Sequence, residues 1–283
     1  MNTIISAIDF SKSSLHALEY AINLANKVES DIIMTWVDTT SNVDSDISAM
    51  QREQRHEIKE QFDELIEIYQ PKLLNGKLSY KLRKGKIFQE IANQAKYEDA
   101  GLVVAGSHGI SGYEKYWIGS NAYRIVSYSP CPVITVRLNY NFKKEIKTII
   151  LPIDSTLETR QKVPQVANLA RFYDSEIHIL AVYTSSIKTI MSKVDQYAEQ
   201  AAKFIHQSGV KFQVETLKVN NLTTEVIKYA EKVDADLISI MTEQETSASN
   251  ILLGPYAKQM VNNSPIPVLT VQAEEIMKIH TGN

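Results

Sequence analysis

An internal repeat constrains this chain more than any other feature of its sequence. Residues 125–136 read IVSYSPCPVITV and residues 260–271 read MVNNSPIPVLTV, so Ser-Pro-x-Pro-Val followed by an apolar pair recurs at an offset of 135. A repeat of this length indicates that one folding unit occurs twice. The 283 residues are also enough for two domains of ordinary size.

The amino ends of the two copies match at a different offset. Residues 6–25 align with residues 151–170 at an offset of 145, which places Asp9 opposite Asp154. The first copy is therefore longer by about ten residues. We expect the extra residues in the polar stretch 39–57, which we interpret as a surface loop running into a helix.

Within each copy, short β-branched runs alternate with longer amphipathic segments. This alternation is typical of parallel sheets with crossover helices. We therefore predict the α/β fold class, with two tandem open five-stranded parallel sheets. The predicted strands are residues 3–8, 31–37, 77–83, 101–106 and 132–137 in the first copy, and 147–153, 177–183, 212–219, 236–241 and 266–271 in the second. The helices between the first strands include residues 13–27, 58–69 and 119–128.

The repeat also sets the predicted domain boundaries. The first domain covers residues 1–139 and the second covers residues 147–283. The polar residues 140–146 form the linker between them.

Composition excludes several classes of protein. Hydrophobic residues make up 44% of the chain and charged residues 22%, which fits a globular protein. With a net charge of -3, neither half is a basic surface for nucleic acid. We expect no membrane span, because no run of eighteen apolar residues occurs. We expect no secretory signal, because the first residues lack a basic segment followed by a long apolar stretch. A single cysteine, Cys131, allows no internal disulfide, so we expect a cytoplasmic protein.

Glycine is concentrated in one segment. Of the 10 glycines, five lie between positions 101 and 119. This segment connects a predicted strand to a predicted helix at the carboxyl edge of the sheet, where open α/β sheets bind ligands. Glycine-rich turns and helix amino ends present backbone amides to anions. The segment therefore predicts a phosphate-binding loop.

Two common phosphate motifs do not fit this loop. Gly101 and Gly106 have the spacing of the Walker motif, but Ser107 stands where its lysine is required. The dinucleotide motif G-x-G-x-x-G is absent. The loop of the related enzymes that adenylate their substrates is absent too, so an adenylate-transferring enzyme ranks last among the hypotheses.

A different spacing does fit. Gly106, Gly109, Gly119 and Ser120 match G-x2-G-x9-G-S. Together with an early strand that ends in an Asp and a final S-x-C-P-V strand, this spacing resembles the universal stress protein family. The resemblance covers nearly the whole chain twice, once per copy, and implies the tandem type of that family, with an adenine nucleotide alpha hydrolase-like fold.

The resemblance implies an ATP-binding stress-response protein. In nucleotide-binding members ATP lies at the carboxyl edge of the strands, and a magnesium ion can accompany it. The implied contacts are Asp9 to the nucleoside end, the Val37 backbone to adenine, the loop residues Gly106, Ser107, His108 and Gly109 to the phosphates, and Gly119, Ser120 and Asn121 to the terminal phosphates. The family also pairs its final strands across a dimer, so we expect an intramolecular pseudo-dimer of the two domains, and two chains can assemble further as a homodimer.

The second copy departs from the glycine pattern. The aligned positions are Met241, Gln244, Gly254 and Pro255, so only one glycine is kept. Proline has no amide hydrogen to donate, and the other two positions add side chains. We therefore expect one ATP per chain, bound by the first domain.

Several residues have a second interpretation. Asp9 either contacts the ligand or only caps the first helix. Cys131, between two prolines, is favoured as a packed thiol over a reactive one. The histidines show no metal-ligand spacing, so no built metal site is expected.

No general base is evident near the loop, so we expect hydrolysis that is slow or absent and not an enzyme function. The alternative function is a scaffold that binds no nucleotide and holds a protein partner or an apolar metabolite.

Overall fold

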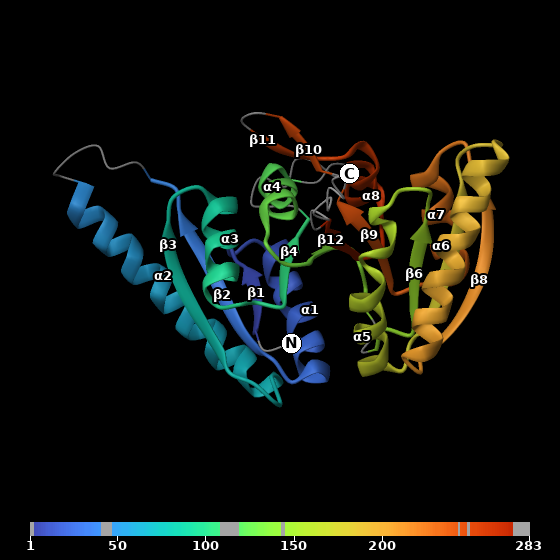
Figure 1. Ribbon diagram of the computed structural model, residues 1–283. Coiled ribbons are helices and arrows are strands. Elements are labelled where there is room, and N and C mark those ends of the chain that lie inside the picture. Colours follow the sequence, from blue (N-terminus) through green and yellow to red (C-terminus); the bar gives the residue numbers. More distant parts are fainter. Residues whose placement is uncertain are drawn as a thin grey trace, which may run out of the picture. The chain divides into compact units, whose positions relative to one another are not determined.

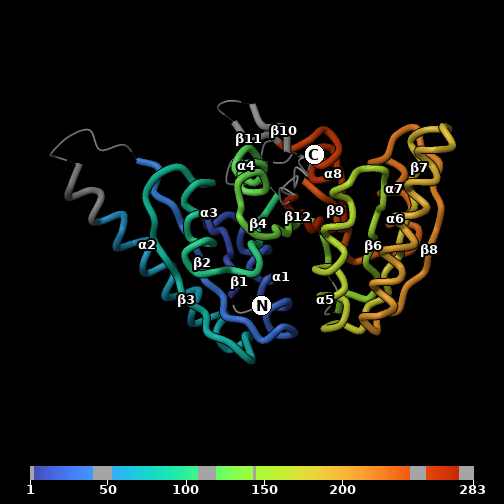
Figure 2. The backbone as a smooth tube through the Cα atoms, viewed as in Figure 1, coloured from blue at the N-terminus to red at the C-terminus, as the bar shows by residue number. Residues whose placement is uncertain are grey.

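A computed structural model of the chain describes residues 3–40, 47–107, 119–142, 145–242, 244–247 and 250–273. By its internal contacts the chain divides into two units, one of Met1–Glu145 with Met260–Leu269 and one of Ile146–Gln259 with Thr270–Asn283. Each unit contains most of one copy of the repeat. The path of the backbone through both is shown in Figure 2.

The first unit is built on five strands in the order β3-β2-β1-β4-β5, and every neighbouring pair is parallel (Figure 1). The strands are β1 (Thr3–Ala7), β2 (Asp31–Asp38), β3 (Leu78–Lys84), β4 (Leu102–Gly106) and β5 (Val133–Val136). The central strands β1 and β4 are almost fully buried, because helices cover the sheet on both faces.

The helices of this unit are α1 (Lys12–Val28), α2 (Ile47–Tyr69), the short 3-10 helix η1 (Gln70–Lys72), α3 (Ile87–Tyr97) and α4 (Ser120–Tyr128). Helices α3 and α4 pack against each other on one face of the sheet. Helix α2 begins at Ile47, so the helix into which the stretch 39–57 was expected to run begins earlier than the predicted Ile58.

Helix α1 approaches strand β4 closely at Gly106. A Cβ atom on Gly106 would lie 2.7 Å from the Ser13 carbonyl oxygen and 2.8 Å from its carbonyl carbon. Distances this short cannot be relieved by rotating a side chain, because both atoms belong to the backbone of the first turn of α1. A residue without a side chain is therefore required here for packing, independently of any ligand.

The second copy of the repeat has the same arrangement of strands and helices. Its strands run in the order β12-β9-β6-β7-β8, and β6 pairs in parallel with β7 and β9, as β7 does with β8. They are β6 (Thr148–Ile153), β7 (Glu176–Tyr183), β8 (Lys211–Lys218), β9 (Leu237–Thr242) and β12 (Val268–Gln272). The helices are α5 (Val163–Tyr173), α6 (Lys188–Gln207), α7 (Leu222–Lys232) and α8 (Pro255–Asn263). The predicted fold class, with a parallel sheet in each copy, is confirmed.

Two features of the second unit have no counterpart in the sequence-based prediction. A 3-10 helix, η2 (Glu158–Arg160), precedes α5. A small antiparallel hairpin of β10 (Gln244–Ser247) and β11 (Asn250–Leu253) follows β9. Among the residues described, no helix combines the length and the apolar character needed to cross a bilayer.

The packing at Gly106 yields the first prediction. We expect Gly106→Ala to lower the free energy of unfolding by about 1–3 kcal/mol, the usual cost of forcing extra atoms into a packed contact. Urea unfolding of nucleotide-free protein measures this effect. An unchanged midpoint would mean that the first turn of α1 can move away from β4 without cost.

Candidate functional site

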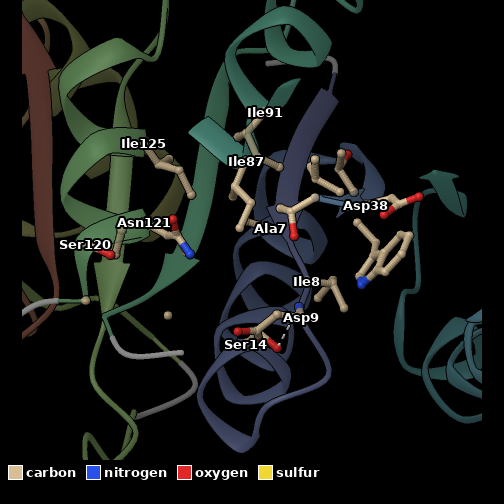
Figure 3. Close-up of a pocket in the computed structure, with 18 of the residues that line it drawn as sticks. Ala7, Ile8, Asp9, Ser14, Asp38, Ile87, Ile91, Ser120, Asn121 and Ile125 are labelled. Carbon is tan, nitrogen blue, oxygen red and sulfur yellow. Dashed lines mark hydrogen bonds between the residues drawn. The ribbon is translucent and has the colours of Figure 1, made fainter. Parts of the chain in front are cut away.

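A cavity of about 460 Å³ opens at the carboxyl ends of β1, β2 and β4 (Figure 3). All of its lining residues belong to the first unit. Its volume lies within the range of small-molecule sites. Its position is also where open α/β sheets bind ligands, outside the carboxyl ends of the strands.

One wall of the cavity is the turn between β1 and α1. The Asp9 carboxylate accepts a hydrogen bond of 3.0 Å from the Ser11 amide, and the Asp9 amide donates to the Ser14 hydroxyl at 3.3 Å (Figure 3). Ser11 caps α1 by accepting from the Ser14 amide at 3.1 Å. Asp9 therefore stabilises the turn, and its second carboxylate oxygen has no hydrogen bond recorded within the described residues.

The opposite wall is the amino end of α4. Gly119 precedes the helix without a side-chain cap, and Ser120 and Asn121 form its first turn. All three line the cavity, and Figure 3 shows Asn121 on the α4 ribbon facing the space beside Ala7. The first amides of a helix have no partner within the helix, so this end attracts anions.

A third wall is apolar. Ile87 and Ile91 of α3 lie between Ala7 of β1 and Ile125 of α4 (Figure 3), and Val37 of β2 also lines the cavity. This wall suits the faces of a planar ring, because it offers carbon surface with few polar groups.

Asp38, at the end of β2, is a lining residue that the sequence analysis missed. Its carboxylate accepts from the Thr40 amide at 2.8 Å and from the Thr40 hydroxyl at 2.7 Å. Burial raises the pKa of Asp38, but the hydrogen bonds from Thr40 and the charges of Lys84 and Arg55 outweigh it and hold the pKa below its ordinary value. The cavity wall thus carries a negative charge here at neutral pH.

The structure brings most of the predicted site residues together. The cavity is lined by Asp9, Val37, Gly106, Gly119, Ser120 and Asn121. Ser107 is buried and does not line it; instead its carbonyl accepts from the Gly119 amide at 2.8 Å, which joins the two ends of the glycine-rich loop. His108 and Gly109 lie outside the described residues.

The remaining lining residues carry no motif. Besides Asp38 and Thr40 they include Thr35, Trp36 and Gln54. The position of Asp38 and Thr40 at the carboxyl end of β2 is a signal that could have found them. Gln54 lies on α2, ahead of the predicted start of that helix, and no sequence signal placed it near the site.

The second unit keeps the turn that follows its first strand, but the residues around that turn differ from those in the first unit. Asp154 accepts from the Thr156 amide at 2.8 Å, and its own amide donates to the Thr159 hydroxyl at 3.2 Å, as at Asp9. Met241, buried at the end of β9, stands at the position of Gly106. Helix α5 begins only at Val163, whereas the residue aligned with the start of α1 is Leu157. The second unit therefore lacks the first turn of this helix. In the first unit that turn packs against Gly106, which has no side chain to obstruct it.

Lys162 is buried within this altered turn. Its Nζ donates to the Thr159 carbonyl at 2.7 Å and to the Thr159 hydroxyl at 3.1 Å. Burial lowers the pKa of Lys162 to about 8, and the negative charge of Asp154 acts in the opposite direction. The amine of Lys162 therefore lies near Asp154. The residue of the first unit that aligns with Lys162 is Ala17, which is small and uncharged.

The phosphate-binding elements are replaced in the second unit as well. The hairpin β10–β11 occupies the connection that holds the glycine-rich loop in the first copy. Helix α8 begins with Pro255, which cannot donate an amide hydrogen. Both changes remove donors that a phosphate chain would need.

Comparison with known proteins agrees with this architecture. A model of the Universal stress protein family matches residues 1–137 and again residues 145–272. The chain belongs to the universal stress protein family. The two matches make it a tandem member, as the sequence analysis expected.

Individual universal stress proteins are similar to part or all of the chain. The protein YxiE of Bacillus subtilis is 30% identical over 146 residues, which are 48% of this chain and 99% of the relative. The protein MJ0531 of Methanocaldococcus jannaschii is 28% identical over 140 residues, 44% of this chain and 82% of the relative. A universal stress protein from Archaeoglobus fulgidus superposes with a TM-score of 0.75 at 18% identity, covering 96% of this chain and 99% of its own.

Metal ligands and the single cysteine are two further features that could mark a site. Within the described ranges, no group of three or more His, Cys, Asp or Glu side chains is arranged to hold a metal ion. Burial raises the pKa of the Cys131 thiol to about 11, a hydrogen bond with Ser129 acts against this, and the charge of Asp99 adds to it. The thiol is therefore protonated at neutral pH, which accords with a packing role.

Lys162 yields the second prediction. Because its pKa is about 8 in the folded protein and 10.5 ordinarily, the unfolded chain binds more protons between these values, and stability rises with pH across that window. The rise amounts to about 3 kcal/mol at most, at roughly 1.4 kcal/mol per pH unit. We expect Lys162→Met to be more stable than the wild type below pH 8 and to lack this rise.

Chemical unfolding from pH 7 to 10.5 measures the difference between variant and wild type. Lys211→Met, at an exposed lysine of the same unit, is the matched control and should keep the rise. Parallel pH profiles for wild type and Lys162→Met would contradict the role assigned to the buried amine.

Proposed function

We propose that this universal stress protein binds one ATP in the cavity of its first unit and acts as a stress-response regulator. The observation that carries the proposal is the pairing, in one cavity, of an apolar wall with the amino end of α4. A nucleotide has two parts that match them, a flat base for the apolar wall and an anionic phosphate chain for the amino end of the helix. The cavity volume of about 460 Å³ can accommodate such a ligand.

The charges of the residues that line the cavity indicate that a cation accompanies the nucleotide. Among the lining residues that the structure describes, Asp9 and Asp38 are acidic and none is Lys or Arg. The phosphates therefore depend on helix amides, on the glycine-rich loop and on a cation that arrives with the nucleotide. Mg²⁺ is the natural cation, because it binds nucleotide phosphates with few protein ligands.

The second unit is proposed to bind no nucleotide. Met241 replaces Gly106, Lys162 lies near Asp154, and Pro255 begins α8. The first change fills space, the second places a charge beside the aspartate, and the third removes an amide donor that the first unit offers. One ATP per chain follows.

A scaffold role is the second candidate, and one observation favours it. A groove of about 310 Å³ lies between the start of α5 and helix α6, with Leu157 and Phe204 exposed by 52% and 41%. Apolar surface of this kind suits a protein partner or an apolar metabolite. The pairing of the two copies within one chain, the homodimer and the cytoplasmic location stay predictions of the sequence.

Asp9 and Asp154 give a matched pair of variants for testing ATP binding. We expect one ATP per chain for the wild type and about tenfold weaker binding for Asp9→Ala, the usual value of a hydrogen bond to a charged group. Asp154→Ala should leave ATP affinity unchanged, although it loses the same turn hydrogen bond.

Calorimetric titration of nucleotide-stripped protein with ATP and magnesium measures both variants. Equal affinities for the two variants and the wild type would assign Asp9 to helix capping alone. Absence of ATP binding by the wild type would move the protein to the scaffold class.

Hydrolysis is a separate prediction. The described lining residues include no histidine, and the carboxylates of Asp9 and Asp38 already accept hydrogen bonds from Ser11 and Thr40. We therefore expect ATP to be recovered intact after hours of incubation. Chromatography of the nucleotide measures this directly. Turnover above trace level that disappears in His108→Ala would show that a base is present after all.

A further inference from the structure

The groove of the second unit lies between two helices that pack against each other, α5 and α6. Its volume of about 310 Å³ is close to the lower end of small-molecule sites. Most of its surface is carbon, from Leu157, Val163, Pro164, Ala201 and Phe204. These residues all belong to the second unit, so the groove is separate from the nucleotide cavity of the first.

The first unit fills the corresponding place with aromatic rings. The ring of Phe10, just before α1, lies 4.9 Å from the ring of Phe62 on α2. The residue of the second unit that aligns with Phe10 is Ser155, which offers no ring. Leu157 and Phe204 of the groove stay largely exposed. Exposed apolar surface of this kind is a common mark of a binding site.

Positive charge gathers at one side of the groove. The guanidinium of Arg160, a lining residue, lies 4.0 Å from the centre of the buried Tyr197 ring, and the amine of Lys193 lies 5.5 Å from the same ring. In the part of the chain that the structure describes, neither cation forms a salt bridge. The adjacent acidic residues in the sequence, Glu158 and Glu199, do not line the groove. An anion therefore complements this side.

Arg160 is well placed to hold such an anion. Its side chain donates a hydrogen bond to the side chain of Gln200, and the Tyr197 ring supports its guanidinium from one face. A guanidinium has five N–H donors in a planar fork that matches a carboxylate. One hydrogen bond to an amide leaves donors for a ligand.

We propose that this groove binds an amphiphilic carboxylate, an acid with a short alkyl chain. The chain lies against Leu157 and Phe204, and the carboxylate accepts hydrogen bonds from Arg160. The apolar surface and the cation thus each meet one part of the ligand. This binding does not depend on the proposed nucleotide site, because the groove and the cavity lie in different units.

Calorimetric titration of the full chain with octanoate, octanol and octylammonium tests both parts of the site, because these probes share an alkyl chain and differ in the head group. We expect octanoate to bind at least about tenfold more tightly than octylammonium, the usual effect of a hydrogen bond to a charged group. In Arg160→Gln the affinity for octanoate should fall about tenfold, because the carboxylate loses its cation. In Phe204→Ser octanoate and octanol should both bind about fivefold more weakly, because the chain loses apolar surface.

Two residues of α5 provide matched controls. Arg171 and Phe172 are exposed, as Phe204 is, and neither lines the groove. Arg171→Gln and Phe172→Ser should therefore leave the affinities for all three probes unchanged. Thermal unfolding of each variant checks that it is folded. Because Phe204 is exposed, Phe204→Ser keeps the test decisive even if Arg160→Gln lowers stability.

Several outcomes would overturn the proposal. Absence of saturable octanoate binding, or equal affinity for octanoate and octylammonium, would show that the groove is no site for an amphiphilic anion. Octanoate binding that Arg160→Gln and Phe204→Ser both leave unchanged would place the ligand elsewhere. Binding to phosphatidylglycerol vesicles without binding to free octanoate would assign the groove to a membrane surface instead. Failure of ATP to bind the first unit would leave the proposal standing.

Discussion

The contact between Gly106 and the first turn of α1 is the constraint on which the first unit depends. Strand β4 and helix α1 meet so closely there that the Ser13 backbone occupies the space of a Cβ atom. This contact lets α1 begin at Lys12, directly after the Asp9 turn, at the carboxyl edge of the sheet. The same glycine then lines the cavity. Helix packing and ligand access therefore make the same demand on one position, so a glycine here does not by itself prove that a ligand binds.

The second unit shows what happens when that demand is dropped. Met241 brings a side chain to the contact, and the first turn of the helix is replaced by η2 and the segment that leads to Val163. Lys162 then places its amine in the rearranged turn. The hydrogen bonds between backbone amides and side chains around Asp154 nonetheless match those around Asp9. The turn is thus a property of the fold, whereas the open cavity is a property of the residues around it.

Much of the fold could be predicted from the sequence, because the repeat and the hydrophobic periods act over many residues. Every predicted strand is present to within about two residues at each end. The hairpin of β10 and β11 was missed because this segment aligns with the glycine-rich loop of the first copy, which suggested a loop here as well. The start of α2 at Ile47 was missed because residues 47–57 are mostly polar and lack the apolar face by which a helix is identified in a sequence.

The site was predictable only where it uses short motifs. Glycines, a helix start and an Asp after a strand are visible in sequence, and these residues do line the cavity. Thr35 and Ser6 show why the rest is hidden. Both are single hydroxyl residues inside apolar strands, and both are buried without a partner among the described residues. Only the register of β1 against β2 separates them, because it puts Thr35 beside Ala7 and Ser6 beside Met34. The face of a sheet on which a residue lies is set by pairing between distant segments, so the sequence of one strand alone does not show which of two similar residues lies on the side of the cavity.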